Sequence, residues 1–527
     1  MLWKKINSLK KNHLTLISIL LFVVIFVVTR YPRLNNDIIN PDGVNWHYRT
    51  QQFVNGLKYF QFEKTYQHYH PGVTLMWVTG IPIELTKVIT GEKIYNNTNF
   101  ELFDFVAKGS LVFVQLLLSL LAIYLLAKIT DFKKSLIIVS LFTLEPFFVG
   151  NSRLYHLDVL LTLFVFISLL LFHIYVNDLK LFKNPTFDKY TGVLVGLFLT
   201  LSFLTKSIGI GAFVYVVVYL LFSYFINKDK NILKKLPSII LSFVGFTFLF
   251  FPALWVNPVF YITEIFSEGE RVGIRKGHEQ IVFGETTTDA GPIFYLLVLL
   301  IKLSPFILIG FLSSLVPFYK NIKKDFWNLK NKLKSINWLL GIFYLGYLLV
   351  MLFPTKKIDR YMIVLYPLIA YFAYYGYEYL LQKYAKFVKP LLVILFVLFI
   401  IYPLFSVFPY YFTYYSPLFI NAQNAHTILA QKPFGVGIHD LKDLVVKNYG
   451  EVKLGFIDTK PMESIYPASK VFDIRTISTN KYDFIILGPN EEMPEEVLDS
   501  KVTFVKDKSL YINGLEYWRI YAKGKSN

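Results

Sequence analysis

Long runs of apolar residues, nearly free of charge, recur from residue 14 to about residue 408. Examples are 14–28 (LTLISILLFVVIFVV), 159–172 (VLLTLFVFISLLLF) and 390–400 (PLLVILFVLFI). A helix that spans a bilayer needs about 20 mostly apolar residues, because its backbone polar groups must bond within the helix. The sequence therefore predicts a polytopic α-helical membrane protein.

Window hydropathy predicts about eleven spans. They lie near 14–29, 103–127, 135–149, 158–176, 190–205, 208–226, 236–254, 291–318, 336–353, 361–379 and 390–408. Segment 72–90 is also apolar, but Gly80, Pro82 and Glu84 interrupt it, so we expect a re-entrant or interfacial helix that does not cross. The first run follows a basic stretch and precedes no small-residue cleavage site, which predicts an uncleaved span.

The distribution of lysine predicts the orientation of the chain. The net charge is +18, and most of the excess lies in short loops between apolar runs, where it orients the protein in the membrane rather than binding nucleic acid. The N-terminus and the loops near 128–134, 177–189, 227–235, 320–334 and 382–389 are rich in lysine, which places them in the cytoplasm. Loops 30–102 and 255–290, and everything after 409, then lie outside.

The arginines follow a different pattern from the lysines. All nine fall on the predicted outer side: Arg30, Arg33, Arg49, Arg153, Arg271, Arg275, Arg360, Arg475 and Arg519. Arginine binds phosphate or carboxylate in a forked geometry that lysine cannot reproduce. A lineage bias toward lysine is the alternative, but such a bias would not sort arginine by side. The pattern favours a functional outer surface.

The pattern changes after residue 420. VKLGFID, KVFDIR, YDFIILG and KVTFV are typical of short strands, and Asn513-Gly514 between alternating apolar residues predicts a hairpin. We therefore expect a membrane domain at 1–419 and a small extracytoplasmic α/β domain at 420–527. The sequence has no cysteine, which excludes disulfides and thiol chemistry.

Ionisable residues gather at the predicted outer ends of the spans. Asp42 follows the turn-forming pair Asn40-Pro41, where it could cap a helix over 43–56 or act as a base. Arg153, His156 and Asp158 precede the span at 158, where ionisable residues are functional candidates. A structural ion pair between Arg153 and Asp158 is the alternative.

Histidines and a lysine mark two further places. His68 and His70 precede segment 72–90. Their spacing is a weak signal for two ligands of one metal ion, and the alternative is a polar cluster at the membrane interface. Lys206 turns the chain between two spans, where it could extend its ammonium to the interface or hold an anion.

Two charged loops complete the set of candidates. Loop 255–290 carries Arg271, Arg275 and His278, and its length predicts a lid or binding loop. Arg360 stands at the entrance to another span. Several cationic patches on one face, beside acidic residues at the membrane surface, suit a lipid phosphate or pyrophosphate head group.

The order of these motifs resembles the GT-C superfamily of polyprenyl-phosphate-sugar-dependent glycosyltransferases, especially protein O-mannosyltransferases and lipid A aminoarabinose transferases. The resemblance covers most of the chain to about residue 420. It rests on PDGVNWHYRTQQFVNG, YHPGVTLMWVTG, NSRLYHLDVLLTLF, LTKSIGIG, GHEQIVFGETTTDAGPIFYLLVLLIKLSP, KKIDRYMIVLYP and YYFTYYSPL, which follow one another in the family's order.

The resemblance implies an inverting glycosyl transfer at the outer face of the membrane. The family's presumed base matches Asp42, although the family often has Asp-Glu where this chain has Asp42-Gly43. The family's lysine before proline is His70 here, and its later acid and helix-turn lysine match Asp158 and Lys206. The donor would be a polyprenyl-phosphate-linked sugar in the membrane, and the acceptor a hydroxyl or phosphate of a cell-envelope protein, glycolipid or polysaccharide.

Single displacement at an anomeric carbon needs a base on the acceptor and a stabilised phosphate leaving group. We assign Asp42 as the base, and the phosphate to His70, Lys206, Arg271, Arg275 and Arg360. Supporting roles fall to Asp158, Arg153, His156 and His278. A divalent metal near Asp42, Asp158 or His68 is compatible with the sequence but not required by it.

Two other classes of function remain open at this point. A transporter needs polar groups and broken helices near the bilayer midplane, whereas charged residues here concentrate at the outer ends, with Glu145 and Lys302 as exceptions. An inactive lipid-binding scaffold is the second alternative, because Gly43 and His70 depart from the family's pattern.

Overall fold

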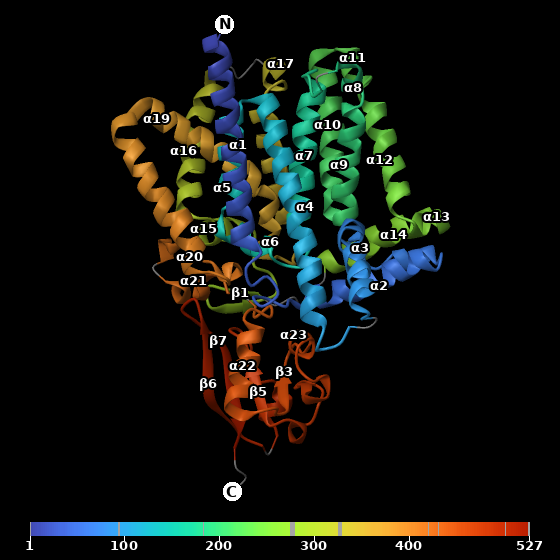
Figure 1. Ribbon diagram of the computed structural model, residues 1–527, viewed down its shortest axis with the longest axis vertical. Helices are drawn as coiled ribbons and strands as arrows, with labels where there is room; N and C mark the ends of the chain where they lie inside the picture. Colours follow the sequence, from blue (N-terminus) through green and yellow to red (C-terminus); the bar gives the residue numbers. More distant parts are fainter. Residues whose placement is uncertain are drawn as a thin grey trace.

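A bundle of long apolar helices stands on a smaller region that contains a β-sheet (Figure 1). The computed structural model describes residues 2–92, 95–182, 184–274, 280–324, 329–419, 421–430, 432–500 and 502–524. The N-terminus lies at the far end of the bundle, and the C-terminus lies beyond the sheet. The two parts follow each other along the chain, as the change of pattern near residue 420 predicts.

Eight helices among the described residues are long and apolar enough to cross a membrane, or nine if one bent pair counts as a single span. The main helices are α1 (Leu2–Arg30), α3 (Val73–Thr90), α4 (Phe100–Ile129), α7 (Asp158–Val176), α9 (Thr191–Thr205), α10 (Ile210–Asn227), α12 (Leu236–Phe250), α16 (Pro305–Lys324), α18 (Ile336–Leu352) and α19 (Tyr366–Phe396). The chain is a multi-pass membrane protein, which confirms the predicted fold class.

The helices differ from the predicted spans where proline interrupts them. The span predicted at 135–149 is α5 (Phe132–Thr143) and α6 (Pro146–Ser152), bent by 73°. The span predicted at 291–318 is α15 (Phe294–Lys302) followed by α16. Proline has no amide hydrogen and fits the first turn of a helix, so Pro146 and Pro305 each begin a new one.

Two further differences concern the number of spans. The segments predicted at 361–379 and 390–408 run together as α19 and its continuation, through a non-helical Tyr384. Segment 72–90 forms α3, which is apolar and long enough to cross but lies beside α2 (Pro41–Lys58) at the sheet end of the bundle (Figure 1). That α3 does not cross the bilayer stays a prediction.

The C-terminal sheet has five strands in the order β4-β3-β5-β7-β6. They are β3 (Leu454–Phe456), β4 (Val471–Asp473), β5 (Phe484–Leu487), β6 (Phe504–Ile512) and β7 (Leu515–Lys523). β3 is parallel to both its neighbours, whereas β7 is antiparallel to β5 and β6. Asn513 and Gly514 both have positive φ and connect β6 to β7, as the hairpin signal predicts.

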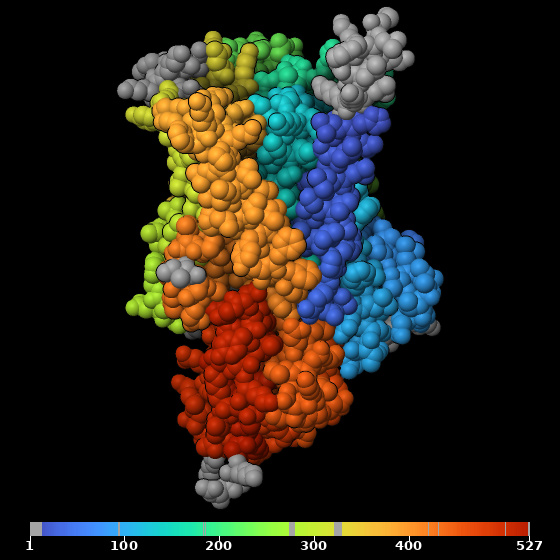
Figure 2. All heavy atoms as spheres, turned by 60° about the vertical axis from the view of Figure 1, so that its left-hand side comes forward, coloured from blue at the N-terminus to red at the C-terminus, as the bar shows by residue number. Residues whose placement is uncertain are grey.

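The sheet region shares its hydrophobic core with the helices. One cluster of buried side chains includes Phe26 of α1 and Trp518 of β7. Figure 2 shows the C-terminal residues packed directly against the end of the bundle, below α1 and α19. The division into domains at 419/420 therefore stays a prediction, because the packing is continuous across it.

The predicted grouping of the loops agrees with their places in the structure. The short helices α8 (Pro185–Asp188), α11 (Lys230–Leu233) and α17 (Leu329–Lys332) lie at the same end as the N-terminus (Figure 1). α2, α3, α14 (Pro258–Ile274) and the sheet lie at the other end. The lysine-rich loops and the proposed functional loops thus occupy opposite ends of the bundle.

A buried ion pair joins the start of the first loop to the bundle. Arg153 and Asp37 are fully buried, and the Nε of Arg153 lies 2.7 Å from Oδ2 of Asp37. The same guanidinium donates to the backbone carbonyls of Arg30 and Pro32, at 2.7 and 2.9 Å. The alternative that paired Arg153 with Asp158 is therefore wrong. Arg153 fastens the end of α1 to α6.

Replacing Arg153 with methionine should destabilise the protein strongly. The change removes the nearer of two cations from the buried carboxylate of Asp37, which keeps only the Lys108 ammonium at 3.8 Å. Breaking a buried pair costs about 3–5 kcal/mol. Thermal unfolding of the protein in detergent measures the loss. The control is Arg475→Met, because Arg475 pairs with Asp473 at the surface with its side chain 53% exposed, where a pair contributes about 0–1 kcal/mol. Equal losses in the two variants would contradict the assignment.

Candidate active site

The first turn of α2 presents a carboxylate that the helix does not use. Asn40 is the N-cap, its side chain accepts from the amide of Gly43, and Pro41 occupies the first helical position. The alternative that made Asp42 the cap is therefore wrong. The Asp42 side chain remains 43% exposed and is available to other groups.

Arg360 joins Asp42 to a second carboxylate, that of Asp158. Its Nη2 lies 2.9 Å from Oδ2 of Asp42, and its Nε lies 3.2 Å from Oδ2 of Asp158. Asp158 is the first residue of α7, and Arg360 belongs to the 3-10 turn η3 (Asp359–Leu365). Residues from three distant parts of the sequence therefore meet at one point.

His156 and Lys206 complete this charged cluster. The two ring nitrogens of His156 lie 3.5 Å from Asp42 and 3.0 Å from Asp158. The ammonium of Lys206 donates to Oδ1 of Asp158 at 2.6 Å and lies 4.2 Å from the ring centre of Tyr361. We call Asp42, His156, Asp158, Lys206 and Arg360 the charged cluster. It alternates acidic and basic groups, which keeps two carboxylates ionised side by side.

A tight turn places Lys206 in the cluster. α9 ends at Thr205, and the 3-10 turn η2 (Ser207–Gly209) leads directly into α10. A Cβ on Gly209 would lie 2.2 Å from the carbonyl oxygen of Ser202, so the turn can close only with glycine there. The side chain of Lys206 is buried although it lies at the end of α9.

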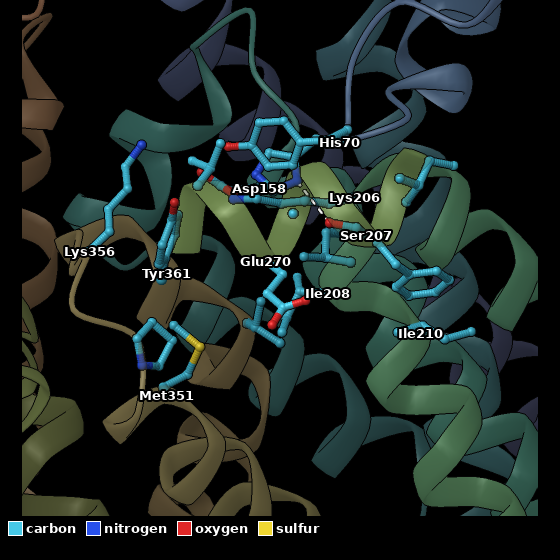
Figure 3. Close-up of a pocket in the computed structure, with 18 of the residues that line it drawn as sticks. His70, Asp158, Lys206, Ser207, Ile208, Ile210, Glu270, Met351, Lys356 and Tyr361 are labelled. Atoms are coloured by element: carbon cyan, nitrogen blue, oxygen red, sulfur yellow. Dashed lines mark hydrogen bonds and ion pairs between the residues drawn. The ribbon is translucent and has the colours of Figure 1, made fainter. Parts of the chain in front are cut away.

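A cavity of about 470 Å³ opens beside the cluster (Figure 3). His70, Asp158, Lys206 and Ser207 lie along one side of it, with Met351 on the other. Most of its remaining wall is apolar, and that wall includes Ile208, Ile210, Ile265, Phe266, Val272 and Val364. The cavity therefore combines a charged end, where Lys206 pairs with Asp158, with an apolar surface from α10, α14 and α18.

His68 and His70 of the first loop are neutral at neutral pH. Burial, and then the charge of Lys206, hold the pKa of His70 well below its ordinary value. Burial, and then the charge of Arg49, lower the pKa of His68 to about 3. Nδ1 of His70 lies 3.0 Å from the hydroxyl of Ser207. His70 thus offers hydrogen bonding to the cavity but no charge.

The carboxyl of Asp42 is ionised at neutral pH. Burial raises its pKa, but the hydrogen bond from His156 and the charge of Arg360 outweigh burial and hold the pKa well below the ordinary range.

The structure shows no cluster of three or more His, Asp or Glu side chains suited to a metal ion among its described residues. The residues suggested for a metal, Asp42, Asp158 and His68, therefore do not form a ligand set.

Other predicted residues lie apart from the cluster. Arg271 belongs to α14, which forms a wall of the cavity, but its side chain is 66% exposed and pairs with Glu268 of the same helix at 2.6 Å. Arg153 takes part in the buried pair with Asp37. Arg275 and His278 lie outside the described residues.

Several residues at the site were not singled out from the sequence. Tyr69, Ser207 and Tyr361 line the cavity, and each is the direct neighbour of a residue that was. Glu270 also contributes to the wall. Adjacency within the motifs YHP, LTKS and KKIDRY was the available signal, because a short turn exposes successive side chains to the same space.

No protein-family model matches the sequence, and no curated protein matches it. Solved structures are similar. The match to ArnT from Cupriavidus metallidurans in the apo state covers 95% of this chain and 97% of the ArnT chain, at 12% identity and a TM-score of 0.51. The apo oligosaccharyltransferase from Archaeoglobus fulgidus covers 90% of this chain and 69% of its own, at 12% identity and a TM-score of 0.51.

A third similar structure is the same oligosaccharyltransferase, AglB, in complex with an inhibitory peptide and a dolichol-phosphate. It covers 90% of this chain and 69% of its own, at 11% identity and a TM-score of 0.50. At such identities the likeness concerns the fold. ArnT and AglB are glycosyltransferases of the superfamily that the motifs resemble. This chain is therefore a polytopic membrane protein with the fold of the GT-C glycosyltransferases.

Proposed function

We propose that the protein is an inverting glycosyltransferase that moves a sugar from a polyprenyl-phosphate donor to an acceptor hydroxyl or phosphate. The observation that carries the proposal is the contact between the charged cluster and the cavity. An ionised, partly exposed carboxylate, Asp42, lies on one side of Asp158, and a buried ammonium beside an apolar cavity lies on the other. That arrangement separates a base from an anion site.

The donor occupies the cavity in this proposal. Its polyprenyl chain lies against the apolar wall, and its phosphate approaches Lys206, Ser207 and His70. Lys206 neutralises the phosphate, while the neutral His70 and Ser207 orient it by hydrogen bonds. The AglB structure that contains a dolichol-phosphate supports a lipid phosphate as the ligand of this fold.

The transfer proceeds by single displacement. Asp42 takes the proton from the acceptor hydroxyl, whose oxygen forms the new bond to the anomeric carbon. The bond from that carbon to the phosphate oxygen breaks, and the polyprenyl phosphate leaves with the electron pair, which Lys206 stabilises. Attack from the side opposite to the phosphate inverts the anomeric configuration. Arg360 and His156 hold Asp42 in its ionised form.

The remaining assignments are extensions of the proposal. Arg271 pairs with Glu268, so it reaches a phosphate only if α14 rearranges on binding. Arg275 stays a proposed phosphate-binding residue, and His278 stays a proposed supporting residue.

In this proposal the site and the sheet face the extracytoplasmic side, and the N-terminus is cytoplasmic. The acceptor is a protein, glycolipid or polysaccharide of the cell envelope. Mannosyl transfer is one form of the reaction.

The position of the cluster does not favour a transporter. A transport site lies near the bilayer midplane, whereas the cluster lies at the ends of α7 and α9 that face α2 and α14. The two charged exceptions, Glu145 and Lys302, bind the backbone at Ser304 and Tyr414. Glu145 lies between α5 and α6, and Lys302 ends α15 just before α16. Both side chains therefore bind backbone groups where helices are interrupted.

Replacing Asp42 with asparagine should lower the turnover number by about 10²–10⁴, the usual contribution of a general base. Asparagine has the same shape, and Asn40 still caps α2, so folding and membrane insertion should be unchanged. Release of polyprenyl phosphate from a lipid-linked sugar, by purified protein in liposomes, measures the effect. Asp499→Asn, at an exposed position of the sheet region, is the control. Normal turnover by Asp42→Asn would reject the role of this residue.

Replacing Arg360 with glutamine should move the acidic limb of the pH–rate profile to higher pH. In the native protein Arg360 helps to hold the pKa of Asp42 below its ordinary value of about 3.9, so the carboxylate stays ionised until the pH falls below that value. Without the guanidinium the pKa rises, and activity is lost earlier on acidification. The measurement is a profile of kcat/KM between about pH 3 and 8, a range that covers the ordinary pKa values of carboxyl and imidazole groups. An acidic limb at the same pH in Arg360→Gln and the native protein would contradict the prediction.

A further inference from the structure

A short segment of the C-terminal region has an unusual backbone and reaches the charged cluster. Phe434, Gly435 and Gly437 all have positive φ, at 51°, 69° and 63°. Glycine adopts such values freely, but a phenylalanine there is strained and persists only where its surroundings hold it. A Cβ at position 435 would lie 1.9 Å from the carbonyl oxygen of Ile39. The segment is therefore pressed closely against the chain just before α2.

Hydrogen bonds from two directions fix this segment. From the sheet, Trp518 donates to the carbonyl of Val436 at 2.8 Å, and Tyr517 donates to the carbonyl of Pro433 at 3.0 Å. From the first loop, the amide of Ile39 donates to Gly435 at 3.2 Å, while the amide of Gly437 donates to Asp37 at 2.8 Å. The segment thus joins β7 to residues 37–39, which lead directly into α2.

The ring of Phe434 lies against the guanidinium of Arg360. The distance from the guanidinium carbon to the ring centre is 4.8 Å. The ring also stacks on Phe412, with centroids 5.2 Å apart, and Phe412 stacks in turn on Phe147 of α6. A cation over an aromatic face is attracted to it, and more strongly where water is excluded. Arg360 is therefore held by two carboxylates and one aromatic ring.

We propose that Phe434 is a positioning residue, through which the C-terminal sheet holds Arg360 against Asp42 and Asp158. The inference rests on the proposed transferase function. Phe434 touches Arg360 from one side and leaves the ion pairs to both carboxylates intact. The sheet anchors the segment, the segment orients the guanidinium, and the guanidinium keeps the base ionised and aimed. The C-terminal region thus takes part in catalysis without contributing a reacting group.

The segment also contacts the loop that the buried Arg153–Asp37 ion pair holds in place. Asp37 bonds Gly437 through its backbone and Arg153 through its carboxylate. The position of the segment therefore depends on the same loop that carries Asp42. Ordinary core packing of the Phe434 ring is the competing explanation. The two explanations differ in whether the effect of replacing Phe434 passes through Arg360.

The test compares Phe434→Leu with three other variants in the assay of polyprenyl phosphate release. Phe434→Tyr keeps an aromatic face toward Arg360. Phe456→Leu removes a ring that is buried in the sheet core, more deeply than the half-buried Phe434, and packs near Trp518. The double variant Phe434→Leu with Arg360→Gln shows whether the two residues act together, since sites that act through one another give non-additive effects.

Phe434→Leu should lower kcat about tenfold, as expected for loss of a partly buried cation–π contact, and should move the acidic limb of the pH profile in the same direction as Arg360→Gln. Phe434→Tyr should retain most of the activity, and Phe456→Leu should leave the limb in place. The double variant should be no slower than Arg360→Gln alone. Additive losses, or a limb that does not move in Phe434→Leu, would overturn the proposal.

A cryo-EM structure of Phe434→Leu provides an arm that does not depend on activity. The guanidinium of Arg360 should leave its position between Asp42 and Asp158, and unchanged ion pairs would overturn the inference. If the native protein releases no polyprenyl phosphate with any lipid-linked sugar, the proposed function fails. The cryo-EM arm then still decides whether Phe434 holds Arg360.

Discussion

The ion pairs between Arg360 and two carboxylates hold the site together. Asp42 and Asp158 come from α2 and α7, and they lie close enough to share one guanidinium and one imidazole. Two carboxylates this close could not both stay ionised without opposite charges between them. Arg360 and Lys206 supply those charges. The arrangement leaves one carboxylate, Asp42, partly exposed and the other, Asp158, buried beside the cavity.

The rest of the fold serves to bring these groups together. Arg153 and Asp37 fix the loop that leads into α2, and the glycine turn after α9 places Lys206 in the charged cluster. From the sheet, the segment at 433–437 reaches back to the same loop and to Arg360. The continuous hydrophobic core between the helices and the sheet also holds the C-terminal region against the site. The C-terminal region is part of the scaffold of the site.

The sequence predicted the fold class well, because apolar runs and hairpin signals are local. It also predicted Asp42, Asp158, Lys206 and Arg360 as candidates, through motif order and the sorting of arginines by side. It could not identify the partner of Arg153, since Asp37 is 116 residues away and no local pattern links them. It also gave Arg271 the same weight as Arg360, because a sequence does not show that Arg271 turns to Glu268 on its own helix. The contact of Phe434 with Arg360 depends on the packing of the sheet against the bundle.

The most direct test of the account is a structure of the protein with bound polyprenyl phosphate, the product that the proposed transfer releases. The account predicts that the phosphate lies within hydrogen-bond distance of the Lys206 ammonium and the Ser207 hydroxyl, with the lipid chain along the apolar wall formed by α10, α14 and α18. A phosphate bound elsewhere, with this cavity empty or open only toward the end of the bundle that carries the N-terminus, would contradict it.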